Sequence, residues 1–226
     1  MLDYRKYPIP RIRHHTSPQL YLPVAQHRTI PEWYPPLIDQ APWESWFANG
    51  RPADVLDIGC GRGGFLLQHA LHRPGQNVLG IEVRHTLVNW INNVIAGEEI
   101  PNARAAWYSV VNGLGFIPDA SIDHAFYLFP DPWPKKRHYK RRAFSPEFLA
   151  EVWRVLRPGG RLYLATDRPD VDEFQRHVLG SMPGVVIRDV VVESDWPFPF
   201  VTDQQDFCHR KDIPYVRYMA SLDPTS

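Results

Sequence analysis

The chain has 226 residues, of which 44% are hydrophobic and 22% charged. That length fits one α/β domain with an appended segment, and the composition argues against wholesale disorder. No apolar run approaches the roughly 18 residues that span a bilayer. No apolar segment follows the cationic N-terminus, so we expect neither a membrane helix nor a signal peptide. Two cysteines, Cys60 and Cys208, cannot form a disulfide framework, which favours a cytoplasmic protein.

The charges are balanced in number but not in position. The chain has 25 basic and 25 acidic residues. Residues 4–15 contain four Arg or Lys and no acid, and residues 135–142 contain six and no acid, so the remainder has 15 basic against 25 acidic residues. The positive charge therefore lies in two short segments on an acidic body. Such an arrangement attracts a polyanion locally and in one orientation.

The N-terminal segment is rich in proline. Eight prolines precede residue 50, and proline interrupts both helices and sheet ladders. We therefore expect a basic, extended N-terminal arm over residues 1–40, followed by a single domain over residues 41–226. One short helix is expected within residues 43–48.

From residue 53 onward, branched apolar runs alternate with helix-like stretches. Strands are expected at 55–58, 78–81, 103–108, 122–129, 162–165, 185–192 and 215–219, and helices at 64–72, 85–96, 146–156 and 171–181. This alternation predicts βαβ units and a parallel sheet. The last two strands lack a full helix between them, so that pair is expected to be antiparallel. The sequence thus predicts a Rossmann-like α/β fold, with a mostly parallel seven-stranded sheet and helices on both faces.

A glycine-rich turn ends the first of these strands and opens the first helix. Gly59, Gly61 and Gly63 let the backbone turn sharply and approach a ligand without a Cβ clash. The same segment also satisfies the dinucleotide fingerprint, so NAD binding and a turn without ligand remain alternatives. Two features favour S-adenosylmethionine. Asp57 precedes the alternating glycines, and Glu82 at the end of the next strand can accept both ribose hydroxyls.

A proline-rich loop follows the fourth strand, and six cations follow the loop. Residues 126–142 read FYLFPDPWPKKRHYKRR. The loop lies at the carboxyl end of a strand, where open α/β sheets bind ligands. Basic side chains can hold phosphates, and the interleaved His138 and Tyr139 can stack on bases. A solvated loop is the other interpretation, but the position of the run favours RNA binding.

The segment Phe129–Arg142 resembles the signature of bacterial tRNA (guanine-N7)-methyltransferases of the TrmB type. Further motifs match in the same order, namely Arg11-Ile-Arg13-His-His15, Gly80-Ile-Glu82-Val, Leu156-Arg-Pro-Gly-Gly160 and Ala165-Thr-Asp167. The resemblance covers residues 53–220 well and the arm loosely. It implies a class I S-adenosylmethionine-dependent methyltransferase that acts on N7 of the variable-loop guanine, position 46, of tRNA.

The resemblance also implies roles for individual residues. Cofactor contacts are expected from Asp57, Gly59, Gly61, Gly63, Glu82, Ser109 and Asp131, substrate contacts from Lys135, Asp167, Thr202, Asp203 and Gln205, and RNA contacts from Arg11, Arg13, Arg137, His138, Tyr139, Lys140, Arg141 and Arg142. Asp131 would lie between cofactor and guanine as the catalytic residue. No histidine has metal-ligand spacing, so no metal is expected. Monomer and homodimer both remain open.

Three positions depart from the family pattern. The final Glu of a C-terminal Thr-x-x-Glu motif is Gln205 here, which keeps an acceptor but loses the charge. The acid usual after the third strand is Ser109, and the first-strand acid, often Glu, is Asp57. Two other functions therefore remain open. One is a non-catalytic RNA-binding protein that retains the fold, and the other is an N7 methyltransferase that acts on another RNA.

Guanine N7 carries an in-plane lone pair and no proton at neutral pH, so its methylation requires no general base. The protein has mainly to align N7 with the methyl carbon and sulfur and to exclude water. Methylation leaves positive charge on the purine, which a fixed carboxylate such as Asp131 stabilises. Asp131 could instead orient the base by accepting its N–H groups, and the sequence leaves both roles open.

Overall fold

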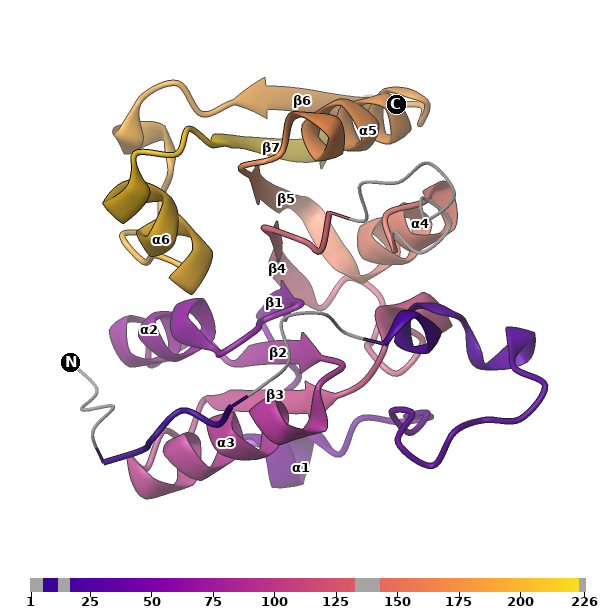
Figure 1. Cartoon of the computed structure of the whole chain (residues 1–226), viewed down its shortest axis with the longest axis vertical. Coiled ribbons are helices and arrows are strands. Elements are labelled where there is room, and N and C mark those ends of the chain that lie inside the picture. The colour runs from indigo at the N-terminus through magenta and orange to yellow at the C-terminus, as the bar shows by residue number, and fades with distance from the viewer. Residues whose placement is uncertain (1–5, 12–16, 133–142, 224–226) are drawn as a thin grey trace.

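The computed structural model describes residues 6–11, 17–132 and 143–223. Its seven-stranded sheet has the order β3-β2-β1-β4-β5-β7-β6 (Figure 1). The strands are β1 (Val55–Ile58), β2 (Val78–Glu82), β3 (Ala103–Trp107), β4 (Ile122–Leu128), β5 (Leu156–Thr166), β6 (Val185–Asp189) and β7 (Val216–Leu222). The first five strands pair in parallel, whereas β7 runs antiparallel to both β5 and β6. The prediction of a mostly parallel sheet with an antiparallel last strand is confirmed.

Helices pack against both faces of the sheet. They are α1 (Trp43–Trp46), α2 (Gly64–His72), α3 (His85–Gly97), α4 (Pro146–Val155), α5 (Pro169–Gly180) and α6 (Asp203–Lys211), with 3-10 turns η1 (Pro18–Tyr21), η2 (Val24–Gln26), η3 (Val110–Asn112) and η5 (Glu193–Asp195). Figure 1 shows α4 and α5 on one side of the sheet and α2 and α6 on the other. One apolar core includes Leu149 of α4 and Leu179 of α5, and a second includes Leu66 of α2 and Ile91 of α3. In the part of the chain that the structure describes, no helix is long and apolar enough to cross a membrane.

The observed elements depart from the expected ones mainly in the C-terminal third. Strand β5 begins at Leu156, directly after α4, rather than at residue 162. Helix α6 is absent from the expected elements, because its sequence is polar and only Gln205 and Cys208 are buried in it. β6 and β7 are antiparallel, as expected. The reason given for that expectation is wrong, because helix α6 lies between the two strands.

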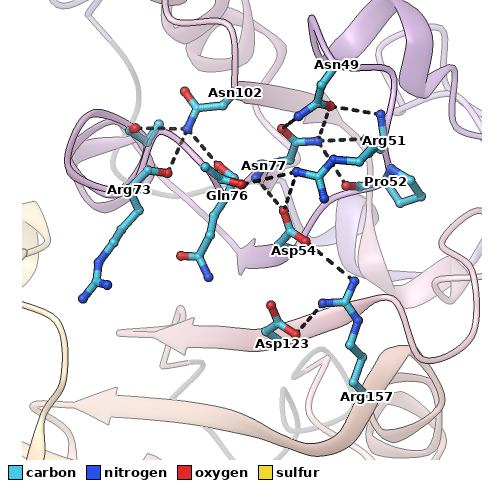
Figure 2. Close-up of polar contacts among 12 residues, drawn as sticks. Asn49, Arg51, Pro52, Asp54, Arg73, Gln76, Asn77, Asn102, Asp123 and Arg157 are labelled. Atoms are coloured by element: carbon cyan, nitrogen blue, oxygen red, sulfur yellow. Dashed lines mark hydrogen bonds and ion pairs between the residues drawn. The ribbon is translucent and has the colours of Figure 1, made fainter.

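A network of polar groups ties together the amino-terminal ends of the central strands (Figure 2). The Asn77 side chain donates to Asn49 Oδ1 at 2.8 Å, and the Asn77 backbone N–H donates to Asp54 Oδ2 at 2.8 Å. Arg157 forms ion pairs with Asp123 and Asp54. These contacts satisfy polar groups that are costly to bury unpaired. They hold the amino-terminal ends of these strands together, and the edge of the sheet formed by the carboxyl-terminal ends lies opposite.

Four parallel strands end side by side at that opposite edge. Ile58 of β1 is in register with Ile81 of β2, and Leu128 of β4 with Ala165 of β5. The residues that follow these strands are therefore neighbours. Open α/β sheets bind ligands in this position.

The proline-rich arm reaches the same edge. Its described residues form only short turns, and Leu20 is buried. The Leu20 carbonyl accepts a hydrogen bond from the Ser109 hydroxyl at 2.6 Å, and the Val24 backbone N–H donates to Asn112 Oδ1 at 2.8 Å. The arm is thus fastened to η3, the turn that follows β3. The division of the chain into arm and domain at residue 40 stays a prediction.

Candidate functional site

The glycine-rich turn between β1 and α2 adopts a backbone that favours glycine. The φ angle is +75° at Gly59 and +73° at Gly63, in a region where other residues are strained. A Cβ at Gly63 would lie 3.0 Å from Ile91, whereas a Cβ at Gly59 would meet no protein atom within 4 Å. Gly63 therefore permits close packing, and Gly59 leaves open space beside the backbone.

Glu82 ends β2 and is bound by both the turn and Arg84. The residue is only 3% exposed. Its Oε2 accepts the Gly61 backbone N–H at 3.0 Å and Arg84 Nη2 at 2.9 Å. Its Oε1 accepts the Arg84 backbone N–H at 2.9 Å and Arg84 Nε at 2.8 Å. Burial lowers the pKa of Arg84, but the hydrogen bonds and charge of Glu82 outweigh burial and raise that pKa. Glu82 and Arg84 therefore form a charged pair at the end of β2.

Asp57 lies in β1 and is 3% exposed. Its Oδ2 is buried with no hydrogen-bond partner among the described residues. Burial, and then the charge of Glu82, raise the pKa of Asp57 to about 7. A buried acceptor without a partner costs free energy. The position is therefore suited to a ligand that brings a donor or a positive charge.

A cavity of about 110 Å³ opens beside these groups. Three charged side chains contribute to its walls, those of Glu82, Arg84 and Asp131. Apolar and aromatic side chains complete the lining, including Ile58, Ile81, Tyr108, Tyr127, Leu128 and Tyr21. An apolar pocket with a few convergent polar groups is typical of a small-molecule site, although such sites usually measure roughly 300 Å³ or more. Tyr21 belongs to the arm, so the arm forms part of the wall of this small cavity.

Asp131 follows β4, and the chain turns sharply before it. Phe129 has a φ angle of +48°, which is unusual for a residue with a side chain. The Tyr21 hydroxyl donates a hydrogen bond to Asp131 Oδ2. Ser109 is buried and bonded to the arm through Leu20. The structure thus brings Asp131 and Glu82 to one cavity, whereas Ser109 contacts the arm, and its predicted contact with a cofactor stays a prediction.

Asp167 follows β5 and contacts helix α6. Gln204 Nε2 donates to Asp167 Oδ2 at 3.1 Å. The Thr202 hydroxyl caps α6 by accepting the Gln205 backbone N–H at 3.0 Å. The Gln205 side chain is nearly buried and donates to the Tyr215 hydroxyl at 3.2 Å. Within the predicted motif, the side chain that reaches Asp167 is therefore Gln204, to which the sequence assigns no role.

Asp203 is the first residue of α6 and lies beside the glycine-rich turn. Its Oδ1 would be 3.4 Å from a Cβ placed at Gly64.

Tyr21 and Arg84 line the cavity, and the sequence analysis assigned a role to neither. The only sequence signal for Arg84 is its position two residues after Glu82, and the arm sequence contains no signal that singles out Tyr21.

The basic segment lies outside the residues that the structure describes. Lys135, Arg137, His138, Tyr139, Lys140, Arg141 and Arg142 fall within residues 133–142, and Arg13 falls within residues 12–16. Their assignment to substrate and RNA stays a prediction. Arg11 is described, and its side chain is exposed.

The fold is shared with solved methyltransferases. The 16S rRNA methyltransferase KamB superposes with a TM-score of 0.55 at 18% identity, over 77% of this chain and 89% of that one. The precorrin-6y C5,15-methyltransferase of Geobacter metallireducens gives 0.54 at 16% identity, over 76% and 81%. The chain thus has a class I methyltransferase fold, and the predicted fold class is confirmed.

Sequence comparison then identifies the family. A family model described as putative methyltransferase matches residues 51–194, and the chain belongs to this family. Proteins called tRNA (guanine-N(7)-)-methyltransferase are similar to it: those of Burkholderia thailandensis, Acidithiobacillus ferrooxidans and Shewanella amazonensis are 37%, 39% and 39% identical over 148, 145 and 137 residues. The matches cover 65%, 64% and 60% of this chain but only 55%, 63% and 58% of those relatives.

Proposed function

We propose that the chain is an S-adenosylmethionine-dependent methyltransferase that methylates N7 of a guanine in tRNA and forms 7-methylguanosine. The observation that carries the proposal is the arrangement of two buried carboxylates, Asp57 and Glu82, around a glycine-rich turn, next to a cavity that Asp131 lines. The names of the relatives support tRNA guanine N7 as the target. The sequence resemblance supports the variable-loop guanine at position 46.

The residues at this edge fit S-adenosylmethionine. The unpartnered oxygen of Asp57 suits an ammonium group, and the two oxygens of Glu82 suit the two hydroxyls of a ribose. The open space beside Gly59 permits close approach to the backbone. An anionic carboxylate at Asp57 would disfavour the pyrophosphate of NAD, whereas an acid at the position of Glu82 is also found in dinucleotide-binding folds. When bound, the cofactor supplies an electrophilic methyl group on a sulfonium.

The protein's own groups would then hold and align the two reactants. Asp131 lines the cavity at the end of β4, where its carboxylate can stabilise positive charge on the purine or accept guanine N–H groups. Asp167 and Gln204 join β5 to α6 next to this edge and offer further polar contacts for the base. Tyr127 and Leu128 give the cavity apolar walls that exclude water. Because guanine N7 carries no proton, none of these residues has to act as a general base.

The proposal is tested by incubating the protein with radiolabelled S-adenosylmethionine and tRNA and analysing the nucleosides. The expected product is 7-methylguanosine, absent when the guanine at position 46 is replaced by adenosine. Methylation that persists after this replacement would refute the position, and a different methylated nucleoside would refute the target atom. Binding of cofactor and tRNA without transfer would indicate the non-catalytic RNA-binding protein instead.

The variant Asp131→Asn separates chemistry from binding. It keeps the size of the side chain but loses the charge. We expect kcat/KM for tRNA to fall at least roughly a hundredfold, the range for losing one preorganised charge-stabilising group. Because Asp131 is also an expected cofactor contact, calorimetry with S-adenosylhomocysteine measures any loss of cofactor affinity separately from the loss of transfer. Full activity in Asp131→Asn would exclude the electrostatic role of this carboxylate.

A further inference from the structure

The carboxylate of Glu82 has no free acceptor position. A carboxylate offers about four lone-pair sites, and four N–H groups are bonded to the two oxygens of Glu82 at 2.8–3.0 Å. Two of the four donors are backbone N–H groups, those of Gly61 and Arg84. The other two are Nε and Nη2 of the Arg84 guanidinium. A ribose can therefore reach Glu82 only if one pair of donors leaves.

The two pairs of donors differ in how easily they can leave. The Gly61 N–H belongs to a turn that is fixed by the packing of Gly63 against Ile91, and the other backbone N–H lies at the start of α3. The Arg84 side chain, by contrast, is 29% exposed and lines the cavity. The guanidinium is carried by a flexible side chain, so it can leave Glu82 while the turn and the start of α3 keep their backbone. The guanidinium is therefore the pair of donors that can be displaced.

The guanidinium and a ribose present matching donors to this carboxylate. The fork of Nε and Nη2 places one N–H on each oxygen of Glu82, which is the bidentate geometry of Arg–carboxylate pairs. A vicinal diol likewise carries two O–H donors on neighbouring atoms. We propose that the Arg84 side chain occupies the ribose-diol position on Glu82 and must swing away for the cofactor to bind. This inference rests on the proposed cofactor, S-adenosylmethionine.

A displaced Arg84 would stay at the mouth of the cavity. The charge of Asp131, which lines the same cavity, already acts on the guanidinium. The arginine therefore moves from one anion towards another and not into bulk solvent. Cofactor binding then changes which carboxylate Arg84 neutralises, from Glu82 at the ribose position to Asp131 at the expected base position.

The experiment compares binding of S-adenosylhomocysteine to the wild type and to Arg84→Met by calorimetry. The methionine keeps an unbranched stem but removes both competing donors. We expect it to bind at least roughly threefold more tightly, because the bidentate guanidinium no longer has to be displaced from Glu82. Arg84→Lys, which keeps the charge but lacks the fork, should also bind more tightly than the wild type. Weaker or unchanged binding in both variants would overturn the proposal and indicate that Arg84 orients Glu82.

Two controls make the result specific. A 2′,3′-dideoxy analogue of S-adenosylhomocysteine has no diol, so Arg84 need not leave, and Arg84→Met should not change its affinity. Equal tightening for both ligands would contradict the proposal, because the gain would then come from charge or loop mobility. Arg51→Met is the matched control variant, since Arg51 pairs with Asp54 at the opposite edge of the sheet. Its affinity for S-adenosylhomocysteine should equal that of the wild type. If the wild type itself does not bind S-adenosylhomocysteine, the proposed function fails rather than the role of Arg84.

Discussion

The hydroxyl of Tyr21 donates a hydrogen bond to the carboxylate of Asp131, a residue 110 positions further along the chain. Tyr21 belongs to the proline-rich arm, and Asp131 lies at the end of the central strand β4. The arm is held in place by Ser109 and Asn112 on the intervening turn. In this arrangement the Tyr21 hydroxyl occupies an acceptor position on Asp131, the carboxylate that we propose faces the guanine.

Removing this hydroxyl should ease the approach of guanine. We expect Tyr21→Phe to lower KM for tRNA roughly two- to tenfold with kcat unchanged, because one hydrogen bond of about 0.5–1.5 kcal/mol no longer has to be exchanged. Steady-state kinetics on tRNA measure both parameters. Tyr7→Phe is the matched control, since the Tyr7 hydroxyl bonds Glu98, which does not line the cavity. A higher KM in Tyr21→Phe would mean that the arm assists RNA binding instead.

The raised pKa of Asp57 predicts a pH-dependent stability. Its pKa is about 7 in the folded protein against an ordinary value of 3.8. Between these values the folded state holds a proton that the unfolded state has lost, so this contribution to stability is complete below about pH 4 and is lost as the pH rises towards 7. Asp57→Asn stays neutral, so its Tm should exceed that of the wild type by more at pH 8 than at pH 5. A difference in Tm that is the same at both values would refute the shift.

Gln205→Glu tests whether the C-terminal motif recognises guanine. A carboxylate makes stronger hydrogen bonds to N–H donors than an amide does, and the Tyr215 hydroxyl, which accepts from Gln205, could donate to it instead. We expect kcat/KM for tRNA to rise by about tenfold or less, since one charge-assisted bond contributes roughly 1 kcal/mol more than a neutral one. If Asp203 already supplies the charge, Gln205→Glu should lower activity and Asp203→Asn should be severely impaired. Wild-type kinetics in both variants would mean that neither Gln205 nor Asp203 recognises guanine.

The basic segment should control the salt dependence of RNA binding. We expect replacement of Lys140, Arg141 and Arg142 by Ala to weaken tRNA binding. The slope of log K against log salt should fall by about one for each phosphate that the variant no longer neutralises. Affinity for S-adenosylhomocysteine should stay unchanged. Arg51 and Arg73, exposed at the other edge of the sheet, provide control substitutions that should leave the slope as it is. An unaltered slope in the triple variant would mean that the segment does not bind phosphates.

The sheet and the glycine-rich turn could be predicted because their signals are local. A buried parallel strand such as Val55–Ile58 is a short, mostly apolar run between turn residues, and the helix Gly64–His72 begins where the glycines end. Helix α6 escaped prediction because its residues are polar and carry no apolar period. A hydrogen bond from the Gln205 backbone N–H to the Thr202 hydroxyl caps the start of this helix. The sequence analysis assigned the same two residues to substrate binding.

Two side chains that line the cavity, those of Tyr21 and Arg84, could not be predicted for a different reason. Tyr21 reaches Asp131 through a fold that brings the arm to the edge of the sheet, and no pattern in a proline-rich segment encodes so distant a contact. Arg84 is close to Glu82 in sequence, but neighbouring residues at a strand end need not bond. The guanidinium turns back onto the carboxylate only because the chain bends between β2 and α3.

The position of β7 has a consequence for synthesis on the ribosome. β7 follows β6 in the chain, yet it lies between β5 and β6 in the sheet. Until residues 216–222 emerge, β6 has no neighbour in the sheet and the ladder of β5 is open on one side. An open ladder is a surface on which other chains can pair and aggregate. The nascent chain therefore carries this hazard until β7 has been made, and a ribosome that stalls before Val216 would release a product lacking the strand that joins β5 to β6.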